Sequence, residues 1–101
     1  MTAASVQVSA TATRWADDHV PGWIEAVIRG ADGRDHRVVE KVPILTALDL
    51  RADSDYPVEL WLSATATVVD GDEVRVVLDH GVETVDGRRE LVVPATDVIW
   101  V

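Results

Sequence analysis

The chain contains no cysteine and no phenylalanine, and it has 9 basic side chains against 18 acidic ones. Without cysteine there can be no disulfide, no thiolate metal ligand and no thiol nucleophile. No run approaches the ~18 consecutive apolar residues of a membrane-spanning helix. The first residues lack the basic flank and the apolar stretch of a signal peptide. We therefore expect a cytoplasmic protein that does not bind a membrane.

The formal net charge of −9 bears on the choice of partner. Nucleic-acid binding depends on clustered lysine and arginine side chains that displace counterions from phosphates. The basic residues of this chain occur in small groups with acids beside them, as at Arg34 and Arg37 or Arg88 and Arg89. The charge pattern therefore excludes nucleic acid as the expected partner and favours a basic protein or a cationic ligand.

The apolar residues are of a kind that favours strands. They make up 48% of 101 residues, with 19 valines and 4 isoleucines against 7 leucines. Branching at Cβ restricts χ1 and suits a pleated surface better than a helix. This length fits one compact core. We therefore predict a single all-β domain over residues 1–101.

Three Asp-Gly pairs lie between valine-rich runs, at Asp32-Gly33, Asp70-Gly71 and Asp86-Gly87. Asp-Gly favours tight turns because glycine readily takes a positive φ. Each pair predicts a hairpin. The expected strands are 5–13, then 23–29 with 35–42, 59–69 with 73–80, and 82–85 with 89–93.

The register of the first hairpin follows from burial. A two-residue loop would place Arg37 and Lys41 on the apolar face of the preceding strand and bury two cations. A three-residue loop places Val38 there instead and sets Arg29 opposite Asp35. We therefore predict the three-residue loop. The same reasoning predicts an odd-numbered loop in the second hairpin.

The rest of the chain indicates how the strands are assembled. Residues 43–57 form a crossover with one helical turn at 46–50. The tail, 92–101, resembles the closing segment of SH3-like small barrels, which implies a fold and no function. We predict a small antiparallel barrel, SH3-like or similar, of 6–7 short strands, with a two-sheet β-sandwich as the alternative. Residues 40–47 and 55–59 resemble short proteins of high-GC bacteria, and this likeness brings no activity with it.

The sequence gives little support for an enzyme. Each of the three histidines follows an aspartate, at Asp18-His19, Asp35-His36 and Asp79-His80, but neighbours on a strand point to opposite faces. No serine lies in a Gly-x-Ser-x-Gly turn, and no glycine-rich loop precedes a helix. The acidic turns lack calcium-loop spacing. We predict no catalytic residue, no metal and no cofactor.

Two groups of residues are candidates for binding. Trp23 and Trp61 occupy otherwise polar strand faces, as partner-binding tryptophans do, unless the crossover covers them. His36, Glu40 and Tyr56 would line a pocket if the barrel mouth is open, and would otherwise lie in water at its rim. Residues 98–101 are apolar at every position. They lie either between the barrel wall and the crossover or against a second subunit.

These observations favour a noncatalytic binding or interaction module that self-associates, with a homodimer as the expected form. The first alternative is an immunity protein or inhibitor that neutralises a basic partner, in keeping with the small size and acidity. The second is a small-ligand-binding barrel with an enzymatic activity.

Overall fold

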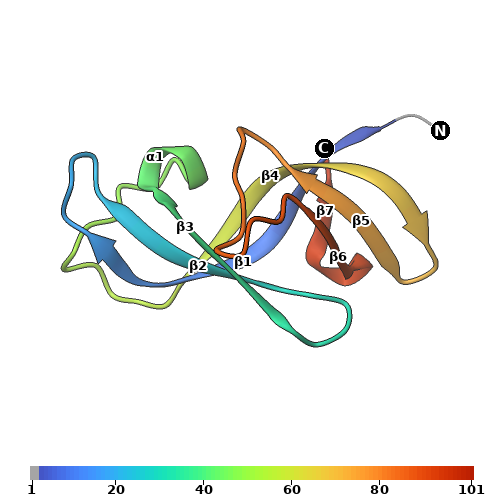
Figure 1. Ribbon diagram of the computed structural model, residues 1–101, viewed down its shortest axis with the longest axis horizontal. Coiled ribbons are helices and arrows are strands. Elements are labelled where there is room, and N and C mark those ends of the chain that lie inside the picture. The colour runs from blue at the N-terminus through green and yellow to red at the C-terminus, as the bar shows by residue number, and fades with distance from the viewer. Residues whose placement is uncertain (1–2) are drawn as a thin grey trace.

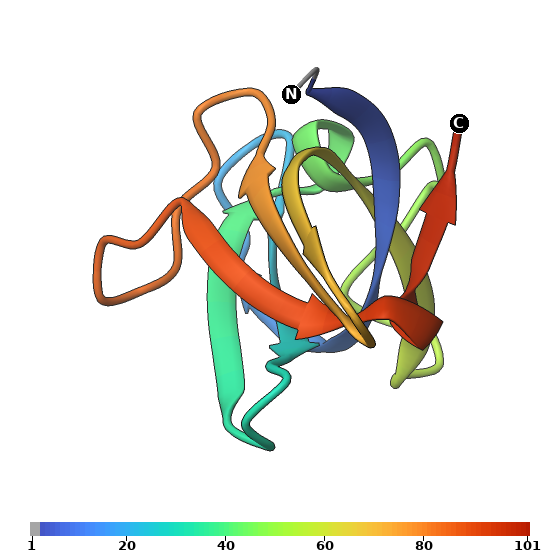
Figure 2. The ribbon, with the colours of Figure 1, turned by 90° about the vertical axis from the view of Figure 1, so that its right-hand side faces the viewer.

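Within residues 3–101, which the computed structural model describes, seven antiparallel strands form one curled sheet (Figures 1 and 2). Its order is β3-β2-β1-β4-β5-β6, and β7 also pairs with β1. The all-β prediction is confirmed, as a curled half-barrel. The elements are β1 (Ala4–Asp17), β2 (Trp23–Arg29), β3 (Asp35–Lys41), α1 (Val42–Leu45), β4 (Val58–Asp70), β5 (Glu73–Leu78), β6 (Glu90–Pro94), a 3-10 turn (Ala95–Asp97) and β7 (Val98–Trp100).

Strand β1 organises the sheet because it has neighbours along both edges. One edge pairs with β4 over residues 4–12. The other edge pairs with β7 over residues 6–8 and with β2 from Thr11 onward. The strict alternation of β1 buries one face of it, and small side chains leave room where the sheet bends. The buried alanines of the core are Ala10, Ala12, Ala26, Ala64 and Ala66.

The register of the first hairpin is as predicted. Ala26 is paired with Val38, which is fully buried, and Arg29 is paired with Asp35. The Gly30 amide donates to the Arg34 carbonyl at 2.7 Å and closes a three-residue loop in which Gly33 has φ +83°. Burial of the apolar face thus decides the length of the loop.

The second hairpin corrects the prediction of an odd-numbered loop. Asp70 is paired with Glu73, so the loop has only two residues. The odd offset comes instead from a bulge between Ala66 and Val68 inside β4. The bulge keeps Ala66 opposite Val76 on the buried face and turns Val68 outward, opposite Arg75. An extra residue in one strand shifts the pairing as effectively as an extra residue in the loop.

The third Asp-Gly pair makes a turn but no hairpin. The Gly87 amide donates to the Thr84 carbonyl, and the Thr84 amide donates to the Arg88 carbonyl at 2.7 Å. Residues 82–85 do not join the ladder, because β6 pairs with β5, as at Val76 and Leu91. The segment between β5 and β6 is a projecting loop (Figure 2). The Val85 amide joins it to the carbonyl of Arg37 on β3 at 2.8 Å.

The crossover supplies apolar side chains to the core. Its helical turn, α1, comes earlier than the predicted 46–50 and begins beside Pro43, which suits the first turn of a helix. Val42, Leu45 and Leu50 are buried. The predicted order of strand, short turn and final strand in the tail is confirmed by β6, the 3-10 turn and β7. No helix among the described residues has the length and apolar character needed to cross a membrane.

Candidate functional site

Trp23 and Trp61 do not share a surface. Along β1, Trp23 is paired with Asp17 and Trp61 with Ser9. Trp23 is half-buried, and the Lys41 ammonium lies 5.6 Å from its ring centroid. That cation–π contact covers part of the indole. As binding residues, the two tryptophans would therefore act separately.

Trp61 stands on an uncharged part of the sheet. Its side chain is 42% exposed, so the crossover does not cover it. Residues 4–13 and 60–69 contain no charged side chain, and they form most of the paired length of β1 and β4. The outward positions around Trp61 are mainly serine, threonine and glutamine. This surface is unusual on a chain of net charge −9.

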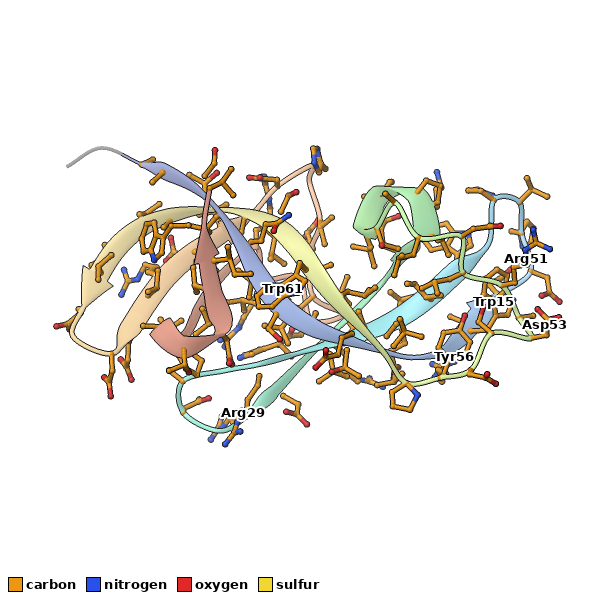
Figure 3. The ribbon with its side chains drawn as sticks, turned by 180° about the vertical axis from the view of Figure 1, so that it is seen from behind. Trp15, Arg29, Arg51, Asp53, Tyr56 and Trp61 are labelled. Carbon is orange, nitrogen blue, oxygen red and sulfur yellow. The ribbon has the colours of Figure 1, made fainter. Side chains whose placement is uncertain are left out.

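A cleft of about 450 Å³ lies on the outer side of the sheet. Trp61 does not line it, but Ser9, which is paired with Trp61 across β1 and β4, does. The cleft forms where β1 passes from pairing with β7 to pairing with β2, and Figure 3 shows this side, with Trp61 and Arg29 labelled. Among the described residues, five lining side chains make no hydrogen bond or ion pair with the rest of the chain. These free groups are Ser9, Thr11, Arg29, Asp35 and Asp97. Val27 lines the cleft as well.

The structure separates His36, Glu40 and Tyr56. His36 lines a groove of about 470 Å³ between the first hairpin and β6, with Arg75 and Arg88. Glu40 and Tyr56 do not line it. The Glu40 carboxylate accepts the Lys41 amide at 2.9 Å, and the Tyr56 hydroxyl donates to the Arg51 carbonyl at 2.7 Å. A ligand site at these three residues stays a prediction, and the structure does not bring them together.

A charged network on the outer side of β1, β2 and β3 was not foreseen from the sequence. The Glu25 side chain is only 10% exposed. Its carboxylate accepts the Thr13 hydroxyl at 2.8 Å, Arg14 Nη2 at 3.1 Å and Arg37 Nη1 at 3.4 Å. The Thr13 hydrogen bond contributes most to lowering the pKa of Glu25, and the two guanidiniums add to it. A bulge between Ala12 and Arg14 lets the neighbouring residues Thr13 and Arg14 reach the same carboxylate. The alternation of the sequence does not predict this contact.

Replacing the network's carboxylate should make stability less dependent on pH. We expect Glu25→Gln to lower the free energy of unfolding by about 1 kcal/mol near neutral pH, since a charge-assisted hydrogen bond is lost. The lowered pKa means that the ionised carboxylate stabilises the fold above its ordinary value of 4.5. That contribution disappears as the pH falls through the lower pKa of the folded state.

Urea unfolding of both proteins across this pH range measures the effect. The difference between wild type and Glu25→Gln should shrink toward acid. Glu59→Gln is the matched control, because Glu59 is exposed and has no hydrogen-bond partner among the described residues. A Glu25→Gln difference that stays constant with pH would show that the charge is unimportant.

Residues 3–101 contain no group of three histidine, cysteine or carboxylate side chains placed to hold a metal ion. No protein-family model, no curated protein and no solved structure matches this chain.

Proposed function

We propose that this protein is a noncatalytic binding module whose working form is a pair of chains joined along β7. The predicted location is still the cytoplasm. A pair joined through strand edges needs no disulfide. The observation that carries the proposal is the chemistry of β7, an open sheet edge without a charge or a proline.

Exposed strand edges can pair with other chains, and proteins usually guard them with charge, proline or a covering segment. Strand β3 carries Arg37 and Lys41 along its edge, and β6 begins at Glu90 and ends at Pro94. The residues of β7 are valine, isoleucine and tryptophan. Of these, Ile99 is 45% and Trp100 is 50% exposed. An edge of this composition is suited to a partner strand.

The pairing of β7 with β1 leaves hydrogen-bonding groups available for that partner. The Val101 amide donates to the Ser5 carbonyl at 3.2 Å, on the β1 side. Because backbone groups alternate along an antiparallel strand, the amide and carbonyl of Trp100 point away from β1. Two copies related by a two-fold axis could hydrogen-bond to each other through Trp100.

Charge also favours this place for contact between copies. Each chain carries a net charge of −9, so most faces repel a second copy. Strand β7 and the neighbouring residues 4–13 of β1 are uncharged. A contact of only three residues per chain is small, so the dimer should be weak and dependent on concentration.

We expect Ile99→Lys to abolish self-association, because it places a cation at the new edge while Lys remains free to reach water. Sedimentation velocity over a range of concentrations should show a monomer–dimer equilibrium for wild type. For Ile99→Lys it should show only the 11.0 kDa monomer. Raising the salt concentration to about 1 M should strengthen the wild-type dimer, because it screens the like charges.

The matched control is Val85→Lys, since Val85 is 54% exposed and lies in the loop between β5 and β6. This variant should dimerise as wild type does. A wild-type protein that stays monomeric at every concentration would overturn the proposal. So would equal weakening by both lysine variants, because the contact would then not be located at β7.

A further inference from the structure

We propose that the cleft beside β1 binds a neutral saccharide and that one sugar ring stacks on Trp61. Ser9 connects the two parts of the site, because it lines the cleft and is paired with Trp61 across β1 and β4. The proposal goes beyond the pairing of chains. Its principal residues, Ser9, Arg29 and Trp61, lie outside β7.

The cleft offers hydrogen-bonding groups that suit sugar hydroxyls. Each sugar hydroxyl can donate and accept. Arg29 offers donors, Asp35 and Asp97 offer acceptors, and Ser9 and Thr11 offer both. Arg29 and Asp35 are opposite each other in the sheet, yet their side chains form no ion pair within the described part of the chain. Their hydrogen-bonding capacity is therefore available to a ligand.

Trp61 supplies the flat apolar surface that stacking requires. The indole is large and rigid, so it can cover the C–H face of a pyranose with little loss of side-chain freedom. Trp61 is the cross-strand neighbour of Ser9, which lines the cleft, so a saccharide longer than one ring can reach the indole from the cleft. The cleft volume of about 450 Å³ lies in the range of small-ligand sites.

The charges of the cleft disfavour an anionic ligand. Arg29 faces two carboxylates, from Asp35 and Asp97, so a phosphate-bearing ligand would meet net negative charge. A nucleic acid would in addition meet the net charge of −9 of the whole chain. A neutral polyhydroxylated ligand avoids both repulsion and the cost of desolvating a charge.

The test is a titration of ¹⁵N-labelled protein with cellohexaose, maltohexaose and chitohexaose, each up to millimolar concentration, followed by NMR. At least one of these saccharides should shift the Trp61 indole N–H signal and the Arg29 amide signal in a saturable way. Trp61→Ala and Arg29→Ala should each weaken that binding about tenfold or more. Trp23→Phe is the matched control and should bind as wild type does, because Trp23 lies elsewhere.

Three results would overturn the saccharide site. The first is that none of the three saccharides causes a saturable shift. The second is that Trp61→Ala and Arg29→Ala bind as wild type does. The third is that oligothymidylate, and no saccharide, shifts the Trp61 signal. Sedimentation velocity shows whether a failed result concerns the saccharide site or the proposed pairing of chains. Trp61→Ala should dimerise normally, and monomeric Ile99→Lys should still bind the saccharide.

Discussion

Gly22→Ala should lower the free energy of unfolding by about 3–5 kcal/mol, a large share of the roughly 5–15 kcal/mol of an ordinary domain. Gly22 has φ +98°, which costs a residue with a Cβ about 1–2 kcal/mol. An added Cβ would also overlap the Trp15 ring, with Cζ2 only 2.6 Å away. The ring cannot move aside freely, because it packs on the core and its N–H donates to Asp18 at 2.7 Å.

Gly33→Ala separates the two costs. Gly33 has φ +83°, but no atom of residues 3–101 lies within 4 Å of an added Cβ. Thermal or urea unfolding should therefore show a loss of only about 1 kcal/mol for Gly33→Ala. The pair Gly22→Ala and Trp15→Ala should be coupled, since removing the ring removes the clash. Equal losses at the two glycines would mean that the contact with Trp15 contributes nothing.

The contrast between the two glycines also shows what the sequence can reveal. A turn over residues 17–22 is evident from its composition, since aspartate, proline and glycine punctuate strands. The seating of Trp15 on Gly22 is not evident, because it depends on how the chain folds back over β1. Turn chemistry is local, whereas the contacts of a turn with an earlier strand are not.

The strand predictions also separate into local features, which the sequence revealed, and pairings between distant segments, which it did not. Alternation correctly assigned β2 and the exposed face of Trp61, because a side-chain period of two is a property of each strand alone. The bulge near Thr67 was missed, since a bulge and an odd loop bury the same residues. The turn at Asp86-Gly87 is present, but β6 pairs with β5 and not with residues 82–85. The composition of a turn does not determine which strands pair.

The cleft lined by Ser9 was missed for the same physical reason. The opposition of Arg29 and Asp35 was predicted, as was the outward position of Trp61. Arg29 and Asp35 can line the same cleft as Asp97 only because β7 and β2 pair with the same edge of β1. Neither the hairpins nor the tail indicates that arrangement, because the sequence of the tail does not determine which strand it pairs with.

The register of the first hairpin can be tested with a single pair of variants. Val38→Arg should prevent folding or lower the free energy of unfolding by more than about 4 kcal/mol, because Val38 is fully buried against Ala26. The core cluster within residues 3–101 is apolar and contains no carboxylate for the new charge. Val39→Arg, one position along the same strand, should cost less than about 1 kcal/mol. Val39 faces outward opposite Glu25, where a guanidinium can reach water or the carboxylate.

Circular dichroism and urea unfolding of the two variants measure this difference. A slip of one residue in β3 would exchange the two side chains between the faces of the sheet, so the opposite order of stability would require the two-residue loop. Equal tolerance of both arginines would mean that β3 is not fixed against the core. The order expected here follows from one physical constraint. A valine can be buried at low cost between β2 and β3, whereas Arg37 and Lys41 must remain in contact with water.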